Sequence, residues 1–336
     1  MDTVFHYYAV AVLARAAGFR PDDALTIATA SQYVDDATES GPIRVGSFLF
    51  DPVRTAHEGL HVFSWSVQKK IYMPFHFLPA QPFAPDLLPD PHFETTADSP
   101  FANLVLDGAL AEPAGVLGLC RIGIALHAFA DTWAHQHFSG KRDRINNISA
   151  LAICRDGRWV RPFWNSLLLD ILPRIGHPQA SAYPDLPHLV WRYRRASGRR
   201  VFVRDNPVLF LQAARRIHER LLEAPKPYPS VAIWTWAAIE GRLQSLFRSP
   251  DEAKRDGDGW REAFGSLFDG LPFRYDKLRW RIEAFDDATK VRWDGKSRAS
   301  FRRMWFRLED GFYDSAWVHF HRAAQKHLDF VLARIV

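Results

Sequence analysis

One segment constrains the fold of this chain more than any other. Residues 114–138 read AGVLGLCRIGIALHAFADTWAHQHF, and their length and composition predict a helix that is apolar almost all round. Such a helix has to be buried, so we expect it to be the central helix of the fold. It also carries His127, Asp131 and His135 at intervals of four residues. Positions four apart differ by about 40° around a helix, so these side chains leave from one face.

The cost of burying those three groups decides how they are interpreted. A desolvated ionisable side chain is strongly unfavourable unless a metal ion or polar partners compensate it. Imidazole nitrogen and carboxylate oxygen both bind zinc at about 2.0–2.2 Å. We therefore interpret His127, Asp131 and His135 as candidate ligands of a metal. A hydrogen-bonded polar network without a metal is the alternative.

Helical periodicity predicts a mainly α fold, a multi-helix domain around one long buried central helix. Residues 41–100 contain many prolines and are interpreted as mostly loop with short helices, and VFV at 201–203 is the best of a few weak strand patterns. We expect a metal-binding helical domain over residues 1–220 and a helical C-terminal extension packed on it over 221–336, or one continuous domain. Besides 114–138, the predicted helices are 4–17, 21 to about 35, 206–222, about 231–247 and about 311–334.

Composition excludes several classes of protein. Apolar residues make up 47% of the 336 residues, enough for a sizeable core, and the net charge of +5 is too small to argue for nucleic acid. Two cysteines, Cys120 and Cys154, exclude a disulfide scaffold and a cysteine-based zinc site. The apolar stretch near the N-terminus lacks a basic start and ends at Arg15, which suits neither a secretory signal nor a membrane span. We expect a cytoplasmic protein without a transmembrane segment.

Further histidines and acidic residues could join the site on the central helix. Asp35 and Asp36 end the second predicted helix, where carboxylates are unfavourable against the helix dipole unless a cation is near. Taken singly, each of the other candidates also fits an ordinary core or surface residue. They are His6 among aromatic residues, His57 and His61 at i, i+4, His76 between two phenylalanines, and His177 with Asp185 in a proline-punctuated loop.

Taken together, these motifs have a recognisable order. HAFADTWAHQHFSG resembles the helix signature of the zinc-dependent phospholipase C / single-strand-specific nuclease superfamily, in which a His, three residues, an Asp, five residues and a His follow one another. More closely, FHYYAVAVLARAAGF, ASQYVDDATES, PFHFLP and IGHPQASAYPDLP resemble an uncharacterised bacterial family known only as a domain of unknown function. The residues that match the superfamily's ligand positions are His6, Asp35, His76, His127, Asp131 and His137.

The resemblance covers roughly residues 1–220 and implies a mostly helical fold with up to three zinc ions in a cleft. Helix geometry favours His135 as a ligand, whereas the family spacing favours His137, and both stay open. The implied ligand sets are Asp35, His76, His127 and Asp131 for one zinc, His135 or His137 with His177 and the additional candidate Asp185 for a second, and His6 with the shared Asp131 for a third.

From these ligand sets we predict a zinc-dependent hydrolase. Paired divalent ions suit in-line displacement at phosphorus and activate a water at neutral pH, which favours a phosphodiester or phosphomonoester, an anionic substrate. Asp35 and Asp131 are the candidate catalytic residues. Arginine-rich runs at 194–200 and 301–307 could attract that substrate or membrane lipid, or be solvated faces. The alternatives are a non-catalytic helical protein with a structural or vestigial metal, and another metal hydrolase that acts, for example, on an amide.

Overall fold

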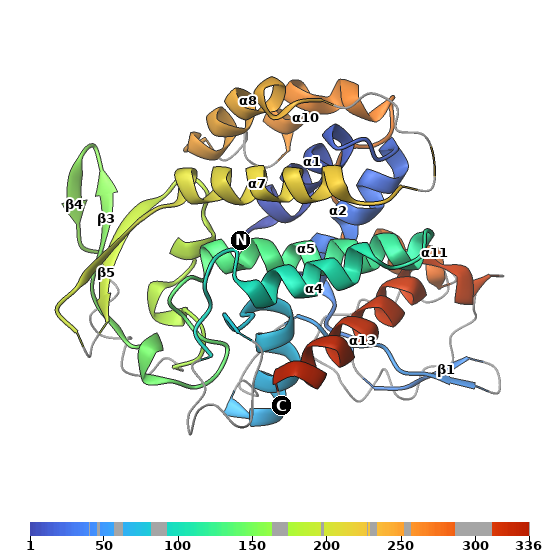
Figure 1. The fold of residues 1–336 in the computed structure, drawn as a ribbon, viewed down its shortest axis with the longest axis horizontal. Coiled ribbons are helices and arrows are strands. Elements are labelled where there is room, and N and C mark those ends of the chain that lie inside the picture. The colour runs from blue at the N-terminus through green and yellow to red at the C-terminus, as the bar shows by residue number, and fades with distance from the viewer. Residues whose placement is uncertain are drawn as a thin grey trace.

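Helix α5 (Val116–Ala134) runs through the middle of the computed structural model, as its apolar sequence predicts (Figure 1). Among the residues described, it is the one helix long and apolar enough to cross a membrane, but 83% of its apolar window is buried inside the protein, as in a core helix. The helices packed against it are α2 (Pro21–Asp36), α4 (Pro100–Leu110), α7 (Asn206–Glu223) and α13 (Ala316–Ile335).

The description covers most of the chain. His57, His61 and the basic run at 301–307 lie outside the described residues, as do two residues of the run at 194–200. The described residues are 1–39, 41–45, 48–56, 63–81, 93–162, 174–195, 198–226, 228, 234–251, 257–285 and 311–335.

Local sequence signals account for the helix starts. Pro21 occupies the first turn of α2, followed by two aspartates that suit the positive end of the helix dipole. The Ser99 hydroxyl accepts a hydrogen bond from the backbone N–H of Ala102 (3.1 Å) and caps α4. The other helical elements are η1 (Val4–Ala9), α1 (Val10–Ala16), α3 (Trp65–Val67), η3 (Gln68–His76), η4 (Arg144–Asn146), η5 (Pro178–Ala180), η6 (Tyr183–Asp185), α8 (Trp236–Arg248), α10 (Asp258–Phe264), η7 (Gly265–Phe268), α11 (Arg279–Ala284) and η9 (Phe312–Asp314).

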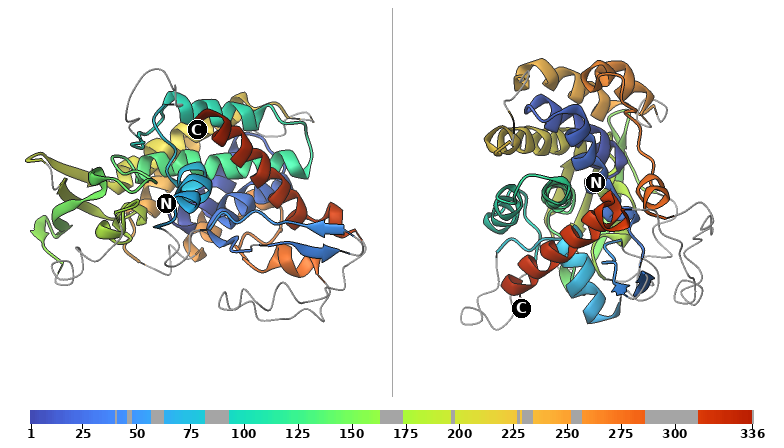
Figure 2. Two further views of the ribbon diagram at one scale, coloured as in Figure 1. Left: turned by 90° about the horizontal axis from the view of Figure 1, so that it is seen from below. Right: turned by 90° about the vertical axis from the view of Figure 1, so that its right-hand side faces the viewer.

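A four-stranded antiparallel sheet shows that the prediction of a mainly α fold is wrong. The fold is helix-rich but mixed α/β, with strand order β4-β3-β5-β6 and a separate hairpin of β1 and β2. The sheet projects from one end of the molecule, and the hairpin lies at the other end (Figures 1 and 2). The strands are β1 (Ile43–Val45), β2 (Phe48–Phe50), β3 (Ile148–Arg155), β4 (Arg158–Val160), β5 (Val190–Arg195) and β6 (Val201–Asp205).

The missed strands have physical reasons to look unlike strands. A bulge between Ser149 and Ala152 breaks the alternation of β3. Strand β5 reads VWRYRR, and its outward positions are arginines, so it resembles a basic loop. Its inward Trp191 and Tyr193 pack with Phe77 and Phe138 in a hydrophobic cluster that joins the sheet to the helices. Only β6 was anticipated, at 201–203.

A glycine lets helices α2 and α5 approach closely. A Cβ atom added at Gly123 would lie 2.7 Å from the Cβ of Ala30, nearer than side chains pack. The close contact brings Ser31 of α2 within hydrogen-bond reach of His127 on α5, since the Ser31 carbonyl accepts from His127 Nδ1 at 2.8 Å. Packing at Gly123 therefore sets the distance between the two helices that carry Asp35 and His127.

Candidate metal centre

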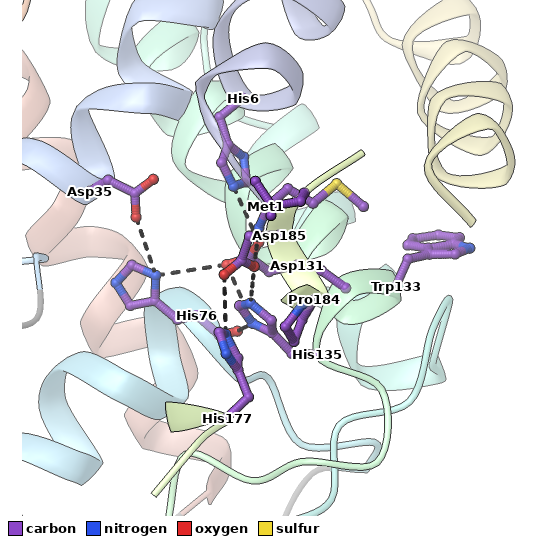
Figure 3. Close-up of polar contacts among 12 residues, drawn as sticks. Met1, His6, Asp35, His76, Asp131, Trp133, His135, His177, Pro184 and Asp185 are labelled. Atoms are coloured by element: carbon purple, nitrogen blue, oxygen red, sulfur yellow. Dashed lines mark hydrogen bonds and ion pairs between the residues drawn. The ribbon is translucent and has the colours of Figure 1, made fainter. Parts of the chain in front are cut away.

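Eight acidic and imidazole side chains from separate segments converge around the C-terminal half of α5 (Figure 3). Asp131 lies at their centre, with most of the others pointing toward it. Their ligand atoms form three groups within which all atoms lie within 4.8 Å of one another. The groups are His6, His127 and Asp131; Asp35, His76 and His127; and His135, His177 and Asp185.

The spacing of the donor atoms around His127 is close to that of a tetrahedral metal site. Nε2 of His127 lies 3.2 Å from Nδ1 of His76, and both nitrogens lie 3.7 Å from Oδ1 of Asp35. Oδ2 of Asp131 lies 3.4 Å from the His127 nitrogen and 3.7 Å from the His76 nitrogen. Donors bound to one zinc at about 2.0–2.2 Å in a tetrahedral array stand about 3.3–3.6 Å apart. Five of the six donor pairs lie within about 0.1 Å of this spacing, whereas Asp35 and Asp131 belong to different groups.

The far nitrogens of these two imidazoles are fixed by backbone carbonyls. Nε2 of His76 donates to the carbonyl of Thr55 (3.0 Å), and Nδ1 of His127 donates to the carbonyl of Ser31 (2.8 Å). In each ring this arrangement leaves the other nitrogen with its lone pair directed at the group. Metal-binding histidines in proteins are oriented in this way by a second hydrogen bond.

The second group forms where the chain folds back on itself. Nε2 of His135 lies 2.9 Å from Oδ1 of Asp185, and Nε2 of His177 lies 3.3 Å from Oδ2 of the same carboxylate. The far nitrogens again donate to backbone carbonyls. Nδ1 of His135 donates to the carbonyl of His76 (2.7 Å), and Nδ1 of His177 donates to the carbonyl of Ser181 (3.0 Å). The short 3₁₀ turns η5 and η6 bring His177 and Asp185 together despite their spacing of eight residues.

Asp131 connects the groups through both of its oxygens. Oδ2 faces the first group and also lies 3.6 Å from Nδ1 of His135, while Oδ1 lies 3.2 Å from Nε2 of His6. The Met1 amine forms an ion pair with Oδ1 and lies 3.2 Å from Asp185. Among the described residues, Nδ1 of His6 has no hydrogen-bond partner and Nε2 has its 3.2 Å contact with Asp131, although the ring is fully buried. Buried nitrogens without a hydrogen bond are costly, so they fit a ligand position better than a packing role.

Burial and neighbouring charges set the protonation states of the site. Burial alone would raise the pKa of Asp131, but His135, the Met1 amine and His127 hold it well below its usual range. Burial lowers the pKa of His177 to about 4 and outweighs the effect of Asp185. Burial also disfavours a charged Met1 amine, but Asp131 and Asp185 prevail and raise its pKa to about 11. At neutral pH Asp131 is therefore charged and His177 is neutral, and the charged Met1 amine offsets part of the negative charge that a cation would meet.

Two predicted residues lie outside the cluster. Nδ1 of His137 donates to Glu94 at 2.8 Å, and Arg195 binds the same carboxylate at 2.6 Å. Of the alternatives His135 and His137, the structure thus brings only His135 into the groups. Asp36 turns away from the cluster and accepts a hydrogen bond from Tyr275 at 2.7 Å.

Three side chains of the cluster are partly exposed to solvent. The side chains of Asp35, Asp185 and His177 are 30%, 22% and 16% exposed, whereas those of His6, His127 and Asp131 are buried. A substrate or water could approach the cluster at these three side chains. A metal held only for stability is commonly enclosed by its ligands, whereas a catalytic metal keeps an open position.

Two features of the site were not anticipated. No sequence motif predicts that the Met1 amine lies beside Asp131. Asn206 is fully buried, and its amide donates to the carbonyls of Tyr183 (2.6 Å) and Leu186 (2.8 Å), which flank Asp185. The position of Asn206 before Pro207 predicts the start of a helix. That Asn206 also holds the loop around Asp185 is visible only in the folded structure.

Comparison with known proteins identifies a family but gives no information on activity. A search of curated proteins and a search of solved structures each give no significant match. The model of a family of unknown function, DUF6765, matches residues 1–335, and the chain therefore belongs to this family.

Proposed function

We propose that the protein is a zinc-dependent hydrolase, a phosphoesterase that cleaves phosphodiester or phosphomonoester bonds. The single observation that carries the proposal is that Asp35 and Asp131 both approach His76 and His127. The donor atom of each carboxylate stands 3.4–3.7 Å from those of the two imidazoles, which stand 3.2 Å apart. The fixed far nitrogens of His76 and His127 support it, because they hold both imidazoles in the tautomer that binds a cation.

The choice of a phosphate ester rests on two supports. The sequence motifs resemble the zinc-dependent phospholipase C / single-strand-specific nuclease superfamily, and Asp131 lies between two groups that could each hold an ion. When bound, two neighbouring zinc ions would supply positive charge for both oxygens of a displacement at phosphorus and a water acidic enough to ionise near neutral pH. Two or three ions fit the number of donors.

The chain's own residues have separable tasks in this proposal. Asp131, buried and charged, positions the two groups relative to each other through its two oxygens. Asp35 presents Oδ1 to His76 and His127, and its Oδ2 lies 3.4 Å from Gln32. Because the side chain is 30% exposed, it can orient a water. Burial raises the pKa of Asp35, an effect that His127 and His76 offset only in part, so this carboxylate is suited to accept a proton.

Metal content and hydrolysis measured on matched variants test the proposal. The protein purified with zinc should contain at least two ions per chain and hydrolyse bis(p-nitrophenyl) phosphate or p-nitrophenyl phosphate, with loss of activity on chelation and recovery on adding zinc. Asp131→Asn should lose zinc and activity together. His135→Asn should lose one zinc and most activity.

His137→Asn is the matched control. It makes the same chemical change two residues away, at a position with φ of +73° that asparagine tolerates. Zinc content and activity should stay those of the unmodified protein. Folded protein that binds zinc but cleaves neither ester would favour the non-catalytic alternative, and cleavage of an amide instead would favour the other class of hydrolase. Folded protein without zinc would refute both metal hypotheses.

A further inference from the structure

The outer face of the projecting sheet carries cationic and apolar side chains together. Register places Arg192 opposite Val203 and Arg194 opposite Val201, so these four side chains share one face of β5 and β6. Cys154 pairs with Trp159 and Ala152 pairs with Arg192, which extends the same face across β3 to β4. We call this surface, made of Trp159, Arg161, Arg192, Arg194, Val201 and Val203, the arginine face.

A hollow of about 260 Å³ lies in the arginine face. Arg161, Arg192 and Arg194 line it, together with Val201 and the small residues Ala150 and Ala152. It adjoins the bulge of β3, where Ala150 has φ of +51°. None of the residues that line the hollow is acidic, so it concentrates positive charge in a concave site.

These arginines are not neutralised within the described part of the chain. Arg161, Arg192 and Arg194 form no ion pair there, and Arg192 instead lies 4.4 Å over the ring of Trp159. The nearest acidic side chain in β6, Asp205, stands at the end of the strand and caps α7 through Val208 N–H (3.3 Å). One guanidinium group can bind two phosphate oxygens at once, so a phosphate group complements the hollow in charge and geometry.

The apolar residues decide which phosphate-bearing partner fits. Val201 and Val203 are 50% and 59% exposed, and Trp159 is 37% exposed. Aliphatic side chains beside arginines gain from entry into the interface of a bilayer, whereas a nucleic acid gains most from free aromatic rings, and the Trp159 ring is already covered by Arg192. The sheet also projects beyond the helices, where a flat surface can approach it (Figures 1 and 2).

We propose that the arginine face docks the protein on a bilayer of anionic phospholipid, with a lipid phosphate in the hollow lined by Arg161, Arg192 and Arg194. The docking does not depend on the metal centre, so it is measured by binding rather than turnover. Each basic residue at an anionic bilayer contributes roughly a factor of five to binding. Replacing two of them should weaken binding about thirtyfold.

Sedimentation with vesicles tests the proposal. The protein should bind vesicles of equimolar phosphatidylcholine and phosphatidylglycerol, bind vesicles of phosphatidylcholine alone far less, and be released as salt is raised. Arg192→Gln with Arg194→Gln should lose about thirtyfold in affinity for the anionic vesicles. The matched control, Arg248→Gln with Arg274→Gln, removes the same charge from exposed positions elsewhere and should change binding little.

Three results would overturn the proposal. Equal binding to both kinds of vesicle, or equal losses in the two double variants, would show that the arginine face is not the docking surface. Saturable binding of inorganic phosphate or of a single-stranded oligonucleotide that is lost in the Arg192 and Arg194 variant, with no vesicle binding, would assign the hollow to a soluble ligand. Circular dichroism of each variant verifies that the sheet is folded.

Discussion

Replacing Asn206 with leucine should remove the second metal group while leaving the first in place. Leucine keeps the approximate size of the side chain but removes its polar atoms. The Asn206 amide holds the carbonyls of Tyr183 and Leu186, and its carbonyl accepts from the Trp191 indole at 3.1 Å. Without these bonds the loop that carries Asp185 loses its main attachment to α7.

The size of the effect follows from the contacts. Three buried hydrogen bonds at roughly 1 kcal/mol each give a destabilisation of about 3 kcal/mol. Unfolding entropy of about 2.1 cal/mol/K per residue, over 336 residues, makes this a fall in Tm of about 4 °C. Elemental analysis should show one zinc fewer per chain, because Asp185 no longer faces His135 and His177.

Asn103→Leu provides the control for Asn206→Leu. Asn103 also uses its side-chain amide to bind backbone, the carbonyls of Asp98 (3.2 Å) and Ser99 (3.0 Å), but it lies on α4 away from the cluster. Its zinc content should not change. If Asn206→Leu lowers Tm as expected but keeps every zinc, then His135, His177 and Asp185 do not form a metal site, and the reasoning fails.

Two further predictions test the packing between helices and the burial of a histidine. Gly123→Ala should lower stability by about 1–3 kcal/mol and weaken zinc binding, because the new methyl group pushes α5 from α2; Gly241→Ala, where a methyl group meets nothing within 4 Å, should stabilise by about 0.5–1 kcal/mol. Thermal unfolding measures the stability of the two glycine variants, and zinc titration measures their affinity for zinc. The same effect in both variants would contradict the role given to the close packing at Gly123. Burial lowers the pKa of His321 to about 3. Below about pH 6.5 this histidine binds a proton in the unfolded chain but stays neutral in the folded chain, so the stability of the fold decreases as the pH falls. When the pH falls from 6.5 to 4.5, the unfolding free energy of His321→Leu should decrease by about 2 kcal/mol less than that of the unmodified protein. Denaturant unfolding at both pH values measures this difference. The same decrease in both proteins would show that His321 is not buried as a neutral ring.

The central helix and the candidate ligands on it could be predicted because both follow from local rules. An apolar helix with His127, Asp131 and His135 on one face fixes the direction of three donors without knowledge of any other segment. The partners Asp35 and His76 were identified from their motifs, and their distances depend on contacts such as that at Gly123. His177 and Asp185 were the hardest to pair, because a folded-back loop, and not periodicity, brings them together.

The sheet could not be predicted from the same rules. Strand β3 carries a bulge, and β5 alternates large aromatic residues with arginines, so neither has the usual pattern of an apolar strand. Their pairing joins residues 38 to 47 positions apart in the sequence, such as Ile153 with Trp191 and Ile148 with Arg195. Pairing over such a separation is decided by tertiary packing and leaves little trace in local composition.

The central claim is that the groups around Asp131 hold metal ions, and anomalous X-ray scattering at the zinc edge tests it most directly. Crystals grown with zinc should show one peak about 2.0–2.2 Å from the donor atoms of Asp35, His76, His127 and Asp131, and another beside His135, His177 and Asp185. Crystals of the folded protein that keep these side chains in the same arrangement, with zinc present and no anomalous peak among them, would contradict the account.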